Sequence, residues 1–320
     1  MIASEICQMI GIKYPIFQGG MAWISDARLA AAVSNAGGLG IIACGFEKVD
    51  KVAEQIKLAK TLTDKPFGMN IMLMSRYVDE LVELVVKEKV AVVTTGAGNP
   101  AKYTKPMTDA GILVIPVTAS TGMARNAERN GACAVVAEGT ESGGHIGELA
   151  TMALIPQVKD AVKIPVIAAG GIADGRGIAA AMMLGAVGAQ LGTRFLVAKE
   201  CSAHQNYKDK VLNAKDIDTV STGKRLGHPI RALKTPFSLD LLSKEYDSSV
   251  SNEELEDMDK GALRLAVDEG DLQHGCFLAG QIAGLVNREQ SAAEIISELV
   301  AETEATLRSA ASLVVEGDSL

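Results

Sequence analysis

The chain has 320 residues, enough for two average domains or for one large α/β barrel with additional segments. Its composition is 48% hydrophobic and 22% charged, with a mean hydropathy of +0.19 and no membrane-length apolar run, so disordered and transmembrane classes are excluded. A net charge of -8, a pI of about 5.2 and an aromatic content of 4% provide neither a positive field nor many stacking side chains, which excludes nucleic acid as the main partner.

The cysteines predict neither a disulfide framework nor a zinc site, because they are odd in number, scattered and never spaced CxxC. They are Cys7, Cys44, Cys133, Cys201 and Cys276. This usage fits a reducing cytoplasm. The first residues include Glu5 but no basic n-region and no long apolar run, so we expect no secretory signal.

From Pro15 onward, short apolar runs alternate with small or polar clusters and stretches of helical period. Eight runs predict strands: Pro15 to Gln18, Gly40 to Ala43, Phe67 to Asn70, Ala91 to Thr95, Leu113 to Val117, Ala134 to Ala137, Pro165 to Ala168 and Gly188 to Leu191. Runs such as VAVVTT and IPVIAA are continuously apolar, which is typical of parallel strands that helices cover on both faces.

Eight units in about 180 residues leave roughly 23 residues for each strand, helix and pair of loops, which favours a compact (β/α)8 TIM barrel. The alternative is a doubly wound open sheet. Its GxGxxG fingerprint is missing, however, because the first strand ends in QGGMAW.

The alternation stops after Phe195, and about 125 residues remain that a bare barrel does not need. We therefore divide the chain into a barrel over residues 1–200 and a C-terminal part over 201–320, which we expect to cover one barrel mouth and to contain closing helices.

Within the C-terminal part, the stretch from Asp209 to Ser251 is polar and is interrupted by Pro229 and Pro236, so we expect it to be irregular. Two later stretches, Asn252 to Glu269 and Ser291 to Val314, have the pattern of amphipathic helices.

In barrel enzymes the reacting groups lie at the carboxyl ends of the strands. Two consecutive loops there contain glycine, AAGGIADG after the seventh strand and LGTRF after the eighth. Gly170 and Gly171 alone could serve a tight turn, but together with Gly192 and Thr193 at barrel spacing they predict a phosphate site built from backbone N–H groups.

His145 is the only histidine among these strand ends, and it follows two glycines. An imidazole can donate or accept a proton at neutral pH, so His145 is the candidate catalytic residue, a solvated loop histidine being the alternative. Glu138 and Glu141 are near it in sequence, but nothing fixes their separation.

The sequence has no GxSxG, HExxH or Walker motif, which disfavours serine hydrolysis, zinc proteolysis and P-loop phosphoryl transfer. A barrel with a phosphate site and one histidine but no covalent nucleophile indicates that a cofactor supplies the reactivity.

Taken together, the loops carry a family resemblance. The motifs are YPIFQGGMAW, AGGLGII, KPFGMNIML, VVTTGAGNP, AEGTESGGHIG, IPVIAAGGIADG, QLGTRF and AGQIAGLV. From about Ile10 to Val286 the chain resembles the FMN-dependent enoyl-acyl carrier protein reductase II (FabK-type) family, within the superfamily that also holds the nitronate monooxygenases, formerly 2-nitropropane dioxygenases.

The resemblance implies an FMN site in the barrel. The phosphate would rest on Gly170, Gly171, Gly192 and Thr193 and the isoalloxazine near Gly19, Gly20, Met21 and Asn70, while Glu138, Gly143, Gly144, Gln190 and Ala169 would complete the pocket. His145 would lie by the reacting face as proton source or as donor to the carbonyl oxygen. AGQIAGLV receives no chemical role.

The implied reaction is reduction of a trans-2-enoyl-acyl carrier protein in fatty-acid elongation, with FMN carrying hydride from NADH or NADPH. A nitronate monooxygenase and a non-catalytic flavin-binding barrel are the alternatives. Family resemblance also implies a homodimer and a monovalent cation, for which the sequence offers no ligand cluster and hence no metal site.

One basic stretch stands out on the acidic chain. Between Thr219 and Leu239 there is no acid. The cations there are Lys224, Arg225, Arg231 and Lys234, with His228 beside them. Such an island is a candidate dock for an acidic acyl carrier protein, a phosphopantetheine or the phosphates of NAD(P)H, a solvated basic face being the alternative.

Overall fold

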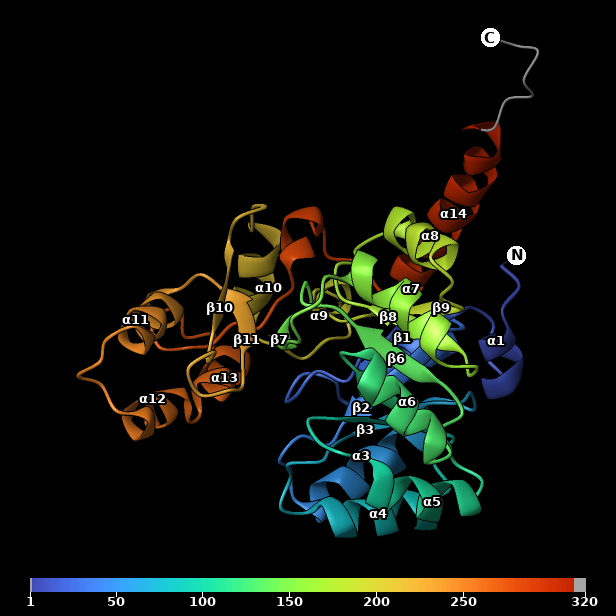
Figure 1. Ribbon diagram of the computed structural model, residues 1–320, viewed down its shortest axis with the longest axis horizontal. Helices are drawn as coiled ribbons and strands as arrows, with labels where there is room; N and C mark the ends of the chain where they lie inside the picture. The colour runs from blue at the N-terminus through green and yellow to red at the C-terminus, as the bar shows by residue number, and fades with distance from the viewer. Residues whose placement is uncertain (1, 314–320) are drawn as a thin grey trace.

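The computed structural model, which describes residues 2–313, is a closed barrel of parallel strands surrounded by helices (Figure 1). The strands follow one another around the barrel in chain order, and the last pairs with the first. They are β1 (Ile16–Gln18), β2 (Leu39–Ala43), β3 (Gly68–Met72), β4 (Val92–Gly96), β5 (Leu113–Thr118), β6 (Val135–Glu138), β8 (Val166–Ala169) and β9 (Gly188–Leu191).

The predicted (β/α)8 TIM barrel is therefore confirmed, and every predicted strand lies within two residues of an observed one at each end. The strands form where they do because almost all of their residues are buried, on the inner face against one another and on the outer face against helices.

Seven outer helices follow the expected strands: α2 (Ala27–Asn35), α3 (Val49–Leu62), α4 (Val78–Lys87), α5 (Ala101–Asp109), α6 (Thr121–Arg129), α7 (Thr151–Ala161) and α8 (Gly175–Met183). After β9 comes only a single turn, α9 (Thr193–Leu196). The eighth outer position is taken by α14 (Ala292–Ala310), which packs between α8 and α2. The strands thus close without the residues after Phe195, by pairing of β9 with β1, whereas the outer layer of helices needs α14 to cover the face that the short α9 leaves open.

The end of the barrel at which the strands begin is closed by α1 (Glu5–Ile10). Ile6 and Ile10 share a buried cluster with the inward-facing strand residues, and the Ser4 hydroxyl donates to the Val187 carbonyl just before β9. Only the carboxyl ends of the strands are left to form a site.

Most of the C-terminal part projects to one side of the barrel, with α11 and α12 at its outer edge and α1 on the opposite side of the molecule (Figure 1). Its elements are α10 (Gln205–Leu212), β10 (Thr219–Thr222), β11 (Ile230–Leu233), α11 (Pro236–Glu245), α12 (Asn252–Asp259), α13 (Ala262–Arg264), the π turn η1 (Leu265–Glu269) and the 3-10 turns η2 (Gln281–Leu285) and η3 (Ala311–Leu313). β11 pairs with β10 and with β7 (Gly144–His145), which belongs to the loop after β6.

The prediction of an irregular stretch from Asp209 to Ser251 is wrong, since β10, β11 and α11 lie within it. Pro236 does not interrupt α11 but occupies its first turn, after the N-cap Thr235. Proline is favoured there because the missing N–H has no helical partner.

The two predicted C-terminal helices differ in outcome. The stretch from Asn252 to Glu269 is broken at Gly261, whose φ of 82° is left-handed, and continues as α13 and η1. The stretch from Ser291 is confirmed as α14 followed by η3, although Val314 lies outside the described residues. The domain division at residue 200 stays a prediction.

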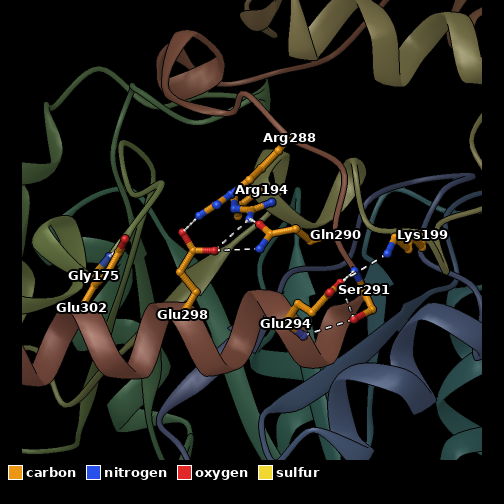
Figure 2. Close-up of polar contacts among 9 residues, drawn as sticks. All are labelled: Gly175, Arg194, Lys199, Arg288, Gln290, Ser291, Glu294, Glu298 and Glu302. Carbon is orange, nitrogen blue, oxygen red and sulfur yellow. Dashed lines mark hydrogen bonds and ion pairs between the residues drawn. The ribbon is translucent and has the colours of Figure 1, made fainter.

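Polar contacts fix α14 to the barrel (Figure 2). The buried Arg194, from the LGTRF loop, donates to the Gln290 side chain and lies 3.9 Å from a Glu298 oxygen of α14. Burial opposes ionisation of Glu298, but hydrogen bonds from Gln290 and Arg288 lower its pKa overall. Arg194, which directly follows the predicted phosphate residue Thr193, is thereby anchored to the helix that completes the barrel.

A second anchor joins α14 to α8. The Gly175 N–H donates to the Glu302 carboxylate at 3.0 Å, and a Cβ on Gly175 would lie 2.3 Å from the Thr303 nitrogen (Figure 2). Glycine is required because the two helices approach too closely for a side chain.

No helix within residues 2–313 combines the length and the apolar character that a membrane crossing needs.

Candidate functional site

A cavity of about 360 Å³ opens at the carboxyl ends of the barrel strands. Every predicted pocket residue except Ala169 lines it, so the structure brings His145 and the predicted cofactor residues together in one place. Ala169 is 1% exposed within β8 and supports the wall from behind. The assignment of these residues to particular roles stays a prediction.

The loops after β8 and β9 form the predicted anion side of the cavity. Gly170 and Gly171 have φ values of 84° and 72°, and a Cβ on Gly170 would lie 2.7 Å from the Gly139 carbonyl oxygen. Side chains are therefore excluded, and the backbone stays open to an anion. The Thr193 hydroxyl accepts a hydrogen bond from the Gly280 N–H at 3.0 Å.

The loops after β1 and β3 form a second, closely fitted wall. A Cβ on Gly20 would lie 2.4 Å from the Cβ of Asn70, and one on Gly19 would lie 3.1 Å from the Gln190 side chain. The Asn70 amide donates to the Thr94 hydroxyl at 2.9 Å, which fixes its orientation. The absence of side chains at Gly19 and Gly20 leaves a surface that a flat ring can approach.

Glu141 holds the β6–α7 loop in place. Its carboxylate accepts hydrogen bonds from the Thr151 N–H, at 2.7 Å, and from the Thr151 hydroxyl, which also lies 2.8 Å from the Gly170 carbonyl oxygen. Since an acid at a helix N-terminus is stabilised there, Glu141 joins the start of α7 to the anion side of the cavity.

Glu138 is the most perturbed acid of the cavity. It ends β6, and burial raises its pKa to about 7 from the ordinary 4.5, while the nearby Ser142 hydroxyl opposes the shift. Glu138 can therefore hold or release a proton near neutral pH.

His145 lies at the mouth of the cavity and remains accessible to solvent. Desolvation by the surrounding protein and then the charge of His228 lower its pKa, and Asp259 opposes them. The imidazole is consequently neutral at pH 7, with one nitrogen donating and the other accepting. The β7–β11 pairing of His145 with Ile230 fixes its backbone.

The AGQIAGLV segment closes the cavity, a role that the sequence interpretation missed. A Cβ on Gly143 would lie 2.6 Å from the carbonyl carbon of Ala279, and one on Gly280 would lie 2.7 Å from the Glu141 carbonyl oxygen. The Gln281 N–H donates to that same oxygen at 2.9 Å. Gly280 could have indicated close packing but not the partner, because the contact spans more than 130 residues.

The basic island is smaller than predicted. Arg231 is 9% exposed and donates to the Thr140 carbonyl at 3.2 Å, so it supports the β6–α7 loop instead of facing a partner. Arg225 is exposed, but its guanidinium donates to the carbonyls of Asp247 and Val250. Lys224 is exposed and Lys234 is half-buried. None of the four lines the cavity.

Across residues 2–313, no group of three or more His, Cys, Asp and Glu side chains could hold a metal ion. The cysteines are all free.

Comparison with known proteins assigns the chain to a family. The family model for nitronate monooxygenases matches residues 3–81 and 74–302. The chain belongs to the nitronate monooxygenase family.

Its relatives carry several activities. FabK from Thermotoga maritima has a solved structure that is 47% identical, with a TM-score of 0.96, over 98% of this chain and 100% of that one. A (3aS,4S,5R,7aS)-5-hydroxy-7a-methyl-1-oxo-octahydro-1H-indene-4-carboxyl-CoA dehydrogenase of Mycobacterium tuberculosis is 33% identical over 98% of this chain and 99% of its own. A probable nitronate monooxygenase of Staphylococcus saprophyticus is 32% identical over 93% of this chain and 97% of its own. The chain is an oxidoreductase of this superfamily.

Replacing Glu138 by Gln tests its perturbed acidity in this family member. In the folded protein the raised pKa makes ionisation costly, a cost that is absent below the unfolded value near 4.5 and complete above about 7. We therefore expect the free energy of unfolding of Glu138→Gln to increase relative to that of the parent as pH rises through this window. At pH 8 the variant should be more stable than the parent by about 1 to 3 kcal/mol.

Urea unfolding of ligand-free protein between pH 4.5 and 8 measures this difference. The exposed Glu148→Gln is the matched control, and its curve should run parallel to that of the parent. A parallel curve for Glu138→Gln as well would show that Glu138 ionises normally.

Proposed function

We propose that the protein is an FMN-dependent enoyl-acyl carrier protein reductase that uses NADH or NADPH and acts in fatty-acid elongation in the cytoplasm. The observation that carries this proposal is a cavity that joins glycine-rich anion loops to a wall with both apolar and polar side chains, with a neutral imidazole at its mouth. The 47% identity to FabK over nearly the whole of both chains supports the reductase within the family.

The residues present fit FMN. Gly170, Gly171, Gly192 and Thr193 offer an uncovered backbone for the phosphate, and the wall made by Gly19 and Gly20 accepts a flat ring because no Cβ fits there. When bound, FMN supplies hydride transfer between the nicotinamide and the substrate.

His145 would act on the substrate. Reduction of a 2-enoyl thioester places negative charge on the carbonyl oxygen and requires a proton at the α-carbon. Being neutral at pH 7, the imidazole can donate its N–H as a hydrogen bond to that oxygen. To supply the proton for the α-carbon it must first take one up from solvent, and the imidazolium then gives that proton to carbon and returns to the neutral form, while Asp259 and His228 adjust its basicity from outside the cavity.

A nitronate monooxygenase is the second candidate, favoured by the family model and by the Staphylococcus relative. The Mycobacterium relative acts on a CoA thioester, which favours a thioester substrate here. A non-catalytic flavin-binding barrel is the third candidate, and it predicts no turnover with any reductant.

Partner binding is part of the proposal. Lys224 and Arg225 lie between β10 and β11, whose neighbour β7 carries His145, so an acidic acyl carrier protein docked there would deliver its thioester to the cavity mouth. NAD(P)H phosphates are the alternative ligand of the same turn. A homodimer and a monovalent cation stay predictions.

The reaction can be tested with purified protein under nitrogen. We expect flavin absorbance that bleaches with NADH or NADPH and returns on adding crotonyl-CoA. Oxygen uptake with a nitronate, without any NADH requirement and without crotonyl-CoA reduction, would instead identify the monooxygenase.

Replacing His145 by Gln should lower NAD(P)H-dependent enoyl reduction at least tenfold and leave FMN bound, because the proposed phosphate contacts are made by Gly170, Gly171, Gly192 and Thr193 and not by this side chain. Steady-state turnover and the flavin spectrum measure the two effects. His274→Gln removes an exposed histidine outside the cavity and should match the parent. Unchanged turnover in His145→Gln would remove this residue from the mechanism.

Replacing Gly171 by Ala should weaken FMN binding at least tenfold, since the new Cβ meets Glu141 at 3.2 Å and the φ of 72° is strained. Quenching of flavin fluorescence on titration gives the Kd. Gly111→Ala is the matched control: its φ is 82°, no atom lies within 4 Å of the added Cβ, and it precedes β5 at the other end of the barrel. Equal losses in both variants would indicate general destabilisation.

A further inference from the structure

The cavity wall divides into two chemically different parts. The loops after β8 and β9 present glycine backbone, whereas the loops after β3, β4 and β5 present small and apolar groups. We name this second part the apolar arc; it consists of Met72, Gly96, Ala97, Val117, Ala119 and Met123, and Thr118 is the one polar residue among them. The cofactor contacts argued above use none of these residues.

The backbone of the apolar arc is firmly held. Ala97 has a φ of 53°, unusual for a residue with a Cβ, and a Cβ on the following Gly98 would lie 2.7 Å from that of Leu73. The Leu73 N–H donates to the Gly96 carbonyl at 2.9 Å. The loops after β3 and β4 therefore form one rigid unit.

A further bond connects this unit to the helix that bears Met123. The Asn126 amide of α6 donates to the Asn99 side chain at 3.0 Å. The arc thus combines a fixed backbone with flexible methionine side chains, which adapt to apolar ligands of varied shape.

The apolar arc leads out of the cavity. Met123 lines the cavity and is 43% exposed, and Met74, two residues beyond Met72, is 53% exposed. The cavity volume of about 360 Å³ is at the low end of the roughly 300–1,000 Å³ that ligand sites occupy. A flavin ring and a thioester leave little room for a long chain, so the chain must continue over an apolar edge.

We propose that the apolar arc binds the acyl chain of the thioester substrate and that the chain leaves the cavity across Met123. This inference rests on the proposed reductase function and adds that substrates of medium and long chain are preferred over short ones. Nitronates of small alkanes would not reach Met123.

The test compares enoyl-CoA substrates of four and ten carbons. Each methylene buried on the arc should raise kcat/KM by up to about fourfold, the equivalent of about 0.8 kcal/mol. In Met123→Glu the ratio of kcat/KM for the ten-carbon to the four-carbon substrate should fall at least tenfold, and in Met123→Leu it should be restored.

The Met123→Glu chain is expected to fold. Met123 is the third residue of α6, after the N-cap Ser120, whose hydroxyl accepts its N–H at 3.3 Å. Glutamate at this position completes a capping box. Met183→Glu is the matched control, since Met183 is 72% exposed on α8 and does not line the cavity, and it should keep the parental ratio.

A binding measurement distinguishes a failure of this inference from a failure of the proposed function. Titration calorimetry of the holoenzyme with saturated decanoyl-CoA and butyryl-CoA should show a longer-chain preference that Met123→Glu removes. A parent that binds in this way but reduces no enoyl thioester would overturn the function and keep the arc. An unchanged chain-length ratio in Met123→Glu, or an equal fall in Met183→Glu, would overturn the arc.

Discussion

The contact of Ala279 and Gly280 with the loop after β6 is the constraint on which the site depends. Gly143 has no room for a Cβ against Ala279, and Gly280 has none against Glu141, while the Gly280 N–H bonds to Thr193. Three segments that are far apart in the chain therefore meet with their backbones in contact. The cavity has its shape because a segment that takes no direct part in barrel closure is packed onto two of the barrel's loops.

The barrel and much of the site could be predicted from the sequence because their signals are local. Strands such as Val92–Gly96 and Val166–Ala169 are buried on both faces and hence continuously apolar, and the residues that follow them face the cavity by the geometry of parallel strands. The position of Gly170 and Gly171 at the cavity was predictable for the same reason, since both residues directly follow a strand.

The remaining features depend on contacts that leave no local pattern. β10 and β11 are four residues each and exist because β11 pairs with β7 from the barrel, so the stretch looked polar and irregular. Arg231 looks like a surface cation in sequence but is buried behind Thr140. The role of α14 as the eighth outer helix follows from the shortness of α9, which only the closed barrel reveals.

The charge state of the cavity limits which substrates it suits. Burial holds Glu138 near its midpoint at neutral pH, and His145 is neutral, so the fixed attraction for an anion comes from the glycine backbone on the side that we propose for the cofactor phosphate. A small nitronate anion would find no cation lining the cavity, because Arg231 is directed into the protein and Lys224 and Arg225 lie outside. A thioester carries no charge at its reacting end and gains from every apolar contact along its chain, which is why the wall from Met72 to Met123 favours the reductase over its sister activity.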